Sequence, residues 1–241
     1  MAEIIYDLMC KGRKIIQNKD GYCFTTDSVL LANFVKLKKT DRAVEFCSGS
    51  GVVSVLVQAK TDCKDISLVE VQPQLADMCN RTIELNDLKG VLKVFNTSFQ
   101  DWAEQNKESL DVVFCNPPYM SNSASEDKNL SYEVRVARHE TLMNLEDLAV
   151  ATKKVLKYGG KFFMVHKAQR FDEILSCFSK HNLAIKNVVF CHPKIDNQAS
   201  FALFEGIKGG KKGLKVLPPL ILNNEDGSVS MAVNDIYNRD I

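Results

Sequence analysis

Short apolar segments alternate with helical segments along most of the chain, and this alternation limits the fold more than any other feature. Seven apolar segments predict strands, at residues 43–47, 66–71, 91–95, 110–115, 161–166, 184–191 and 199–205. Helical patterns flank them at residues 25–39, 52–60, 73–86, 99–107, 145–156 and 171–181. This order predicts an α/β fold with a doubly wound, mostly parallel sheet. Only a loop separates the last two strands, so we expect them to pair antiparallel.

The composition is that of an ordinary globular chain and excludes several classes of protein. The 241 residues are 45% hydrophobic and 25% charged, with a net charge of +1. These proportions exclude collagen-like, coiled-coil and intrinsically disordered chains. The near-zero net charge still permits nucleic-acid binding, because binding depends on where the charges cluster.

The eight cysteines lie far apart, and no two are closer than thirteen positions. This spacing excludes a CxxC-type metal site, so we expect no bound metal. The chain shows no secretory signal and no apolar run of the roughly 18 residues that a membrane span needs. We therefore expect a cytoplasmic protein, free of membrane contacts, whose reduced cysteines pack as small hydrophobic side chains.

A glycine turn follows the first predicted strand, where residues 48–51 read Ser-Gly-Ser-Gly. Gly49 and Gly51 would let the backbone approach a ligand at the carboxyl end of that strand. Glu70 ends the second strand and suits both hydroxyls of a ribose. The turn could also serve NAD, but Ser54 stands where the dinucleotide fingerprint needs a third small residue. Glu45 lies in the first strand and favours a cationic ligand over a pyrophosphate, because carboxylates repel phosphates.

The most specific signal is the sequence Asn-Pro-Pro-Tyr at residues 116–119, which ends the fourth strand. Two prolines fix the backbone, so the carbonyl groups around them have set directions. The Asn116 side chain and the Pro117 carbonyl provide two acceptors for the hydrogens of a planar, conjugated amine. Tyr119 provides a ring for stacking, worth roughly 1–3 kcal/mol per base. This arrangement favours chemistry at an amino group attached to a ring or a carbonyl.

Together these motifs resemble those of the S-adenosylmethionine-dependent amino-methyltransferases. Residues 20–31, 137–140, 159–166 and 218–220 extend the likeness to the bacterial tRNA1(Val) adenine-N6-methyltransferase family. The similarity runs from about Asp7 to about Tyr237. It implies a Rossmann-like class I methyltransferase, with a seven-stranded, mostly parallel sheet whose last strand is antiparallel and helices on both faces.

The resemblance implies methyl transfer from S-adenosylmethionine to the N6 amine of a tRNA adenosine, at position 37 of tRNA1(Val). Asn116, Pro117 and Tyr119 would hold the flipped adenine. The residues expected to hold or cover the cofactor are Phe24, Thr26, Glu45, Gly49, Gly51, Glu70, Ser98 and Asn116. Ser98 stands where many relatives carry an aspartate for the cofactor's adenine, and Cys47 replaces a glycine of the turn.

The resemblance also suggests how one methyltransferase domain, residues 1–241, is organised. Residues 1–40 would form an N-terminal extension that covers the cofactor, residues 41–207 the catalytic core, and residues 208–241 a basic loop and C-terminal extension. Lys211 and Lys212 in that loop, together with Arg138, are candidates for tRNA contacts. Residues 120–137 are polar and without clear periodicity, which predicts a long functional loop. We expect no obligate protein partner.

The sequence also permits other interpretations of the function. The same chemistry serves glutamine side chains of release factors, rRNA guanine and DNA adenine. Only 44 residues precede Glu45, whereas the glutamine enzymes usually carry a helical domain there, and no segment suggests the extra domain of a DNA enzyme. A non-catalytic RNA-binding module is the alternative from another class, and the intact glycine turn and residues 116–119 argue against it.

Overall fold

The computed structural model describes residues 3–18, 23–118 and 144–237. The predicted loop at residues 120–137 lies outside the described residues, as do the predicted site residues Tyr119 and Arg138. All other predicted site residues belong to the described part of the chain.

A single large sheet carries the fold, and all seven predicted strands belong to it. In spatial order the seven are β8 (Leu183–His192), β9 (Phe201–Lys208), β7 (Leu156–Lys167), β6 (Leu110–Cys115), β3 (Arg42–Phe46), β4 (Asp65–Glu70) and β5 (Leu92–Asn96). Strands β3 to β7 pair in parallel, whereas β9 pairs antiparallel with both β7 and β8. The predicted class I α/β architecture, with its last strand antiparallel, is therefore confirmed.

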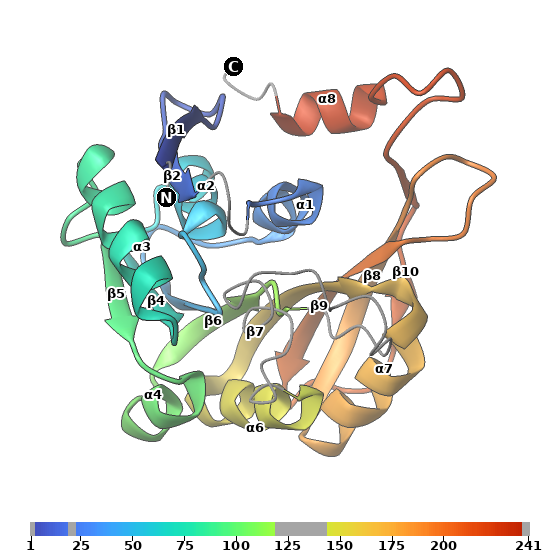
Figure 1. Cartoon of the computed structure of the whole chain (residues 1–241). Helices are drawn as coiled ribbons and strands as arrows, with labels where there is room; N and C mark the ends of the chain where they lie inside the picture. The colour runs from blue at the N-terminus through green and yellow to red at the C-terminus, as the bar shows by residue number, and fades with distance from the viewer. Residues whose placement is uncertain (1–2, 19–22, 119–143, 238–241) are drawn as a thin grey trace, which may run out of the picture.

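Helices cover both faces of the sheet (Figure 1). One face packs against α1 (Thr26–Phe34), α2 (Val52–Thr61) and α3 (Pro73–Leu85), and the other against α4 (Phe99–Gln105), α6 (Leu145–Val155) and α7 (Phe171–Lys180). A short 3-10 helix, η2 (Ala168–Arg170), precedes α7. Alternate residues of β6 enter the two cores: Val112 and Phe114 enter one, and Val113 and Cys115 the other. This alternation is what a strand buried on both faces requires.

One helix end and one strand start differ from those expected. Helix α1 stops at Phe34 rather than near Lys39, so the lysines that follow are not part of its last turn. Helix α6 ends at Val155 and strand β7 begins at once, so Gly160 lies inside a strand instead of stopping a helix. The register between β6 and β7 shifts there. A side chain at Gly160 would place its Cβ 2.9 Å from the Lys157 carbonyl oxygen, which explains the glycine.

Besides η2, five elements have no counterpart in the sequence prediction. They are the hairpin of β1 (Glu3–Asp7) and β2 (Lys14–Asn18), the two-residue strands β10 (Lys215–Val216) and β11 (Leu220–Ile221), and helix α8 (Met231–Tyr237). The hairpin is held by Arg13, which donates to the Asn86 carbonyl at 2.7 Å and to Gln58 Oε1 at 3.1 Å. Strands β10 and β11 pair with β8, and α8 packs against α1. Segments this short carry no periodicity, so only tertiary contacts define them.

Three further features of the structure concern the cysteines, the potential metal ligands and the lengths of the helices. All eight cysteines belong to the described residues and none forms a disulfide; six of them are buried, as expected for small hydrophobic side chains. Within the described residues there is no cluster of three or more side chains that could ligate a metal. Among the helices of these residues, none is both long and apolar enough to span a bilayer.

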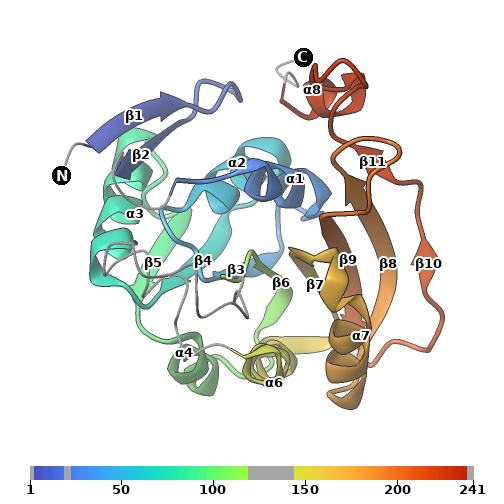
Figure 2. The ribbon, with the colours of Figure 1, turned by 45° about the vertical axis from the view of Figure 1, so that its right-hand side comes forward.

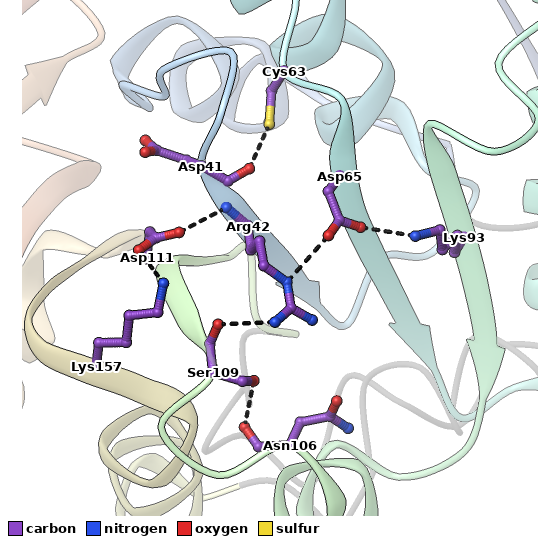
Figure 3. Close-up of polar contacts among 9 residues, drawn as sticks. All are labelled: Asp41, Arg42, Cys63, Asp65, Lys93, Asn106, Ser109, Asp111 and Lys157. Carbon is purple, nitrogen blue, oxygen red and sulfur yellow. Dashed lines mark hydrogen bonds and ion pairs between the residues drawn. The ribbon is translucent and has the colours of Figure 1, made fainter.

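A network of charged side chains joins the amino ends of the parallel strands (Figure 3). Arg42 at the start of β3 donates from Nε to Asp65 at 3.2 Å, and Lys93 donates to the other oxygen of Asp65 at 2.9 Å. Asp111 accepts from the Arg42 backbone N–H and from Lys157. Burial raises the pKa of Asp65, but Lys93 and Arg42 outweigh it and hold the pKa below its usual 3.8. The network therefore stabilises the edge of the sheet opposite the carboxyl ends.

We expect Arg42→Ala to lower the free energy of unfolding by about 1 kcal/mol at neutral pH, since the pair is partly exposed. A lowered carboxyl pKa gives stability that is present above the unfolded pKa and is lost as the pH falls through the folded pKa. The difference between wild type and variant should therefore shrink below pH 3.8. Denaturant titrations at neutral and acidic pH would measure it. A difference that is independent of pH would contradict the assigned role of Asp65.

Candidate active site

Three neighbouring strands bring the predicted site residues to one edge of the sheet. Phe46, the last residue of β3, pairs with Val69 of β4 on one side and with Cys115 of β6 on the other. The glycine turn, Glu70 and Asn116 therefore leave the sheet at the same level. The strand order also diverges at β3, with β4 and β5 on one side and β6 and β7 on the other. In open α/β sheets, ligands bind in the crevice at such a point.

The turn after β3 needs an unusual backbone. Cys47, Gly49 and Gly51 have φ values of 58°, 55° and 88°, in the left-handed region that favours glycine. A Cβ at Gly51 would lie 2.6 Å from the Cys79 sulfur of α3, so this glycine lets α3 pack closely. A Cβ at Gly49 would meet no atom of the described residues within 4 Å. Gly49 thus borders open space, as the approach of a ligand requires, whereas Gly51 is explained by its left-handed backbone and by the close packing of α3.

Glu70 at the end of β4 is 5% exposed and holds this turn in place. Its Oε2 accepts from the Gly49 backbone N–H at 2.8 Å, and its Oε1 accepts from the Gln72 N–H at 2.9 Å. Glu70 therefore fixes the glycine turn at the carboxyl end of β4.

Glu45 lies within β3, beneath the turn, and is 1% exposed. Its Oε2 accepts from both the backbone N–H and the hydroxyl of Ser54, which lies in the first turn of α2. Burial, opposed by these hydrogen bonds and assisted by the nearby charge of Glu70, raises the pKa of Glu45 to about 8. Glu45 is thus mainly protonated at neutral pH and ties β3 to α2. The sequence predicted a cationic ligand beside Glu45. In the structure, Ser54 supplies the hydrogen-bond donors to this carboxyl group.

The Asn116 side chain points to α1, where Ser28 accepts a hydrogen bond from its Nδ2 at 3.0 Å. Ser28 is 3% exposed. Its own backbone N–H donates to Asp27 Oδ1 at 2.8 Å, and the Thr25 hydroxyl donates to the same oxygen. Because Nδ2 faces Ser28, the side-chain carbonyl of Asn116 is directed elsewhere. Sequence reasoning missed Ser28, since its partner is 88 positions away and no local pattern joins them.

A comparison with protein families decides the affiliation of the chain. Residues 24–191 match the sequence model of the family described as "Methyltransferase small domain". The chain belongs to the Methyltransferase small domain family. The matched segment contains α1, the glycine turn, Glu70 and the segment after β6, so it covers the whole candidate site within the described residues.

Two named relatives align with a large part of this Methyltransferase small domain protein. A tRNA1(Val) (adenine(37)-N6)-methyltransferase of Dyadobacter fermentans is 25% identical over 154 residues, which are 61% of this chain and 61% of that protein. One of Trichodesmium erythraeum is 26% identical over 169 residues, which are 67% of this chain and 70% of that protein. The chain thus spans about three fifths of the length of the Dyadobacter relative.

Solved structures support the fold of the Methyltransferase small domain chain. A predicted O-methyltransferase from Agrobacterium tumefaciens superposes with a TM-score of 0.70 at 20% identity, covering 89% of this chain and all of the other. A geranyl diphosphate C-methyltransferase from Streptomyces coelicolor gives a TM-score of 0.55 at 12% identity, covering 76% of each. At these identities the likeness concerns the fold alone.

The other predicted residues of this family member lie in or just before α1, after β6 and at the start of α4. Phe24 and Thr26 are partly buried near α1, and Pro117 is buried directly after Asn116. Ser98 is the N-cap of α4, where its hydroxyl accepts from the Asp101 N–H and donates to the Asp101 carboxylate. The Ser98 hydroxyl therefore donates its proton to Asp101. The predicted contact of Ser98 with a cofactor adenine stays a prediction.

Lys211 and Lys212 are not near this crevice. They follow β9, whose end at Lys208 pairs with Leu183 at the start of β8. The parallel strands begin at that edge of the sheet and end at the edge that carries Asn116 (Figure 2). The structure therefore brings together Ser28, Glu45, Gly49, Glu70 and Asn116, and places the two lysines at the opposite edge.

Proposed function

We propose that this protein is an S-adenosylmethionine-dependent methyltransferase that modifies the N6 amine of an adenosine in tRNA, at position 37 of tRNA1(Val). The observation that carries the proposal is the geometry of Asn116. This amide lies beside the glycine turn, and Ser28 holds its nitrogen so that its carbonyl can accept a substrate N–H. The names of the relatives from Dyadobacter and Trichodesmium support the choice of tRNA.

The residues of the crevice suit S-adenosylmethionine. The open position beside Gly49 would take the methionine part, and the Glu70 carboxylate would accept from the two ribose hydroxyls. Val71, which directly follows Glu70, is 38% exposed and offers an apolar surface for the cofactor's adenine. When bound, this cofactor supplies a methyl group on a positively charged sulfur. Phe24, Thr26 and Ser98 complete the proposed set, with Ser98 acting through its backbone.

The role of the protein in the reaction is to bind and orient the amine. The Asn116 side-chain carbonyl and the Pro117 backbone carbonyl would accept its two N–H groups, and Tyr119 would stack on the ring. These acceptors stabilise the positive charge that grows on N6 as the N–C bond forms and the C–S bond breaks. The methylated amine then loses one proton to water. A flipped nucleotide is needed to reach the crevice, which costs a few kcal/mol.

We also propose that the chain works as one catalytic domain with the three parts expected from the sequence. Residues 1–40 include α1, which contributes Ser28, and residues 208–241 include α8, which packs against α1. The C-terminal extension thus packs against a helix of the N-terminal extension, beside the core of residues 41–207.

The test uses purified protein, labelled S-adenosylmethionine and unmodified total tRNA, followed by mass spectrometry of the nucleosides. We expect new N6-methyladenosine in tRNA and none with the Asn116→Ala protein. Cofactor binding without label in tRNA would remove the RNA target and leave protein glutamine, rRNA and DNA as substrates. No saturable cofactor binding in calorimetry would contradict the enzyme assignment itself.

Ser28→Ala should lower kcat about tenfold, because the lost hydrogen bond lets the Asn116 amide leave its orientation. The cofactor dissociation constant should stay unchanged. In a double-mutant cycle, Ser28→Ala should add little to Asn116→Ala, since both changes remove one function. Ser109→Ala is the matched control, because that hydroxyl donates to the Asn106 carbonyl at the opposite edge. Additive losses in the cycle would refute the positioning role.

A further inference from the structure

The edge of the sheet opposite the active site carries an excess of positive charge around the loop between β9 and β10. Residues 209–215 form this lysine loop, in which Lys211, Lys212 and Lys215 are exposed. Lys186 of β8 joins them: its Nζ donates to the Lys211 carbonyl at 3.1 Å and lies 3.7 Å from the Cβ position of Gly213. Four lysines therefore lie on this surface, in the loop or directly beside it.

Acidic side chains near this surface are already neutralised by other lysines. Glu108 pairs with Lys208 at 2.9 Å, and Glu205 pairs with Lys161 at 3.1 Å. Asp111 pairs with Lys157 in the network at the strand starts. Within the described parts of the chain, no ion pair is found for the four lysines of the surface: Lys186, Lys211, Lys212 and Lys215. Their mutual repulsion makes an anionic partner favourable.

An exposed aromatic ring lies at the base of the lysine loop. Tyr158 is 80% exposed, and its hydroxyl donates to the Gly209 carbonyl at 3.3 Å. A Cβ at Gly209 would fall 2.2 Å from the ring, so the ring lies directly over this glycine. A fixed ring beside ammonium groups suits nucleic acid, because the ring can stack on a base while the lysines contact phosphates. The exposed ring therefore favours a nucleic acid over an acidic protein as the partner.

The lysine surface is too far from Asn116 to touch the same nucleotide. Cys115, before Asn116, is level with Met164 of β7 and Phe204 of β9. Four residues along β9 to Lys208 and three strand spacings across to β8 give a separation of roughly 20 Å. In Figure 2 the chain from β9 to β10 lies beside α7, at the end of β8 away from α8.

We propose that Tyr158, Lys186, Lys211, Lys212 and Lys215 form a second RNA-contact surface, which binds the tRNA body while the target nucleotide occupies the crevice. The proposal rests on the proposed function for the identity of the RNA. It requires a substrate that extends about 20 Å beyond the reacting base. The surface would contribute affinity and orientation, and would take no part in methyl transfer.

The experiment compares full-length tRNA with a three-nucleotide RNA centred on the target adenosine, which is too short to reach the lysine surface from the active site. Lys211→Ala combined with Lys212→Ala should weaken binding of full-length tRNA roughly tenfold at low salt and reduce the salt slope by about 1.5. Tyr158→Ala should weaken it without changing the slope. The affinity for the trinucleotide and kcat at saturating tRNA should be unchanged. The control pair, Lys11→Ala with Lys89→Ala, removes the same charge from the other end of the molecule.

Two results would overturn the proposal. Equal losses for tRNA and the trinucleotide would place the lysines at the target nucleotide. Unchanged tRNA binding would show that the lysine surface does not contact tRNA. Failure of the proposed function appears differently. In that case wild-type protein forms no N6-methyladenosine, whereas titrations of tRNA binding can still report the lysine effect.

Discussion

Asn116→Ala should lower kcat for tRNA methylation by about 100- to 1000-fold, the range found when one preorganised group is removed from an active site. The affinity for S-adenosylmethionine should remain near the wild-type value, because Glu70 and the glycine turn are untouched. The physical reason is loss of the carbonyl that accepts a substrate N–H, together with loss of the contact to Ser28. Single-turnover rates and calorimetry would separate the two quantities.

The control for this prediction is Asn187→Ala, which removes an amide that donates to Glu205 in another part of the sheet. It should leave kcat unchanged, whatever its effect on stability. If Asn116→Ala retained full turnover, Asn116 would have no part in catalysis, and the proposed orientation by Ser28 would lose its purpose.

Glu70→Ala should weaken cofactor binding about 10- to 100-fold, since hydrogen bonds to a charged group contribute roughly 1.5–3 kcal/mol. Two effects add in this variant. The ribose loses its acceptor, and the backbone N–H groups of Gly49 and Gln72 lose theirs, so the glycine turn is no longer held. Calorimetry with S-adenosylmethionine gives the affinity, and a denaturant titration gives the stability.

Comparison with Glu70→Gln distinguishes the two effects of that change. Glutamine keeps one acceptor oxygen and should recover part of the stability, but it cannot accept at both former positions. Glu84→Ala, on the exposed surface of α3 where Glu84 pairs with Lys89, should bind cofactor normally. A dissociation constant unaffected by Glu70→Ala would refute the ribose role and leave Glu70 as a support of the turn.

The sequence predicted those parts of the fold that depend on local pattern. Strands buried on both faces read as continuous apolar runs, so all seven could be located along the chain. Their alternation with helices predicted a mostly parallel sheet, and the resemblance supplied the family. The β1–β2 hairpin was not predicted, because Arg13 is fixed by Gln58 and Asn86, which are distant in sequence. The end of α1 was misplaced because no glycine or proline marks it.

The site residues that belong to a local sequence motif could be predicted. Gly49, Glu70 and Asn116 were identified from their places at strand ends, and the structure brings them to one edge. Ser28 escaped notice because its role exists only through a contact with a residue 88 positions away. The position of Lys211 and Lys212 could not be inferred either, since charge count contains no information about which edge of a sheet a loop occupies.

The place of β9 has a consequence for how the chain folds during synthesis. This strand comes after β7 and β8 in sequence but lies between them, paired antiparallel with both. A nascent chain that has not reached residue 201 therefore has two strands with unpaired neighbouring edges and no correct way to join them. Premature pairing of β7 with β8 would exclude β9, so release of Phe201–Lys208 from the ribosome is the step after which this half of the sheet can close.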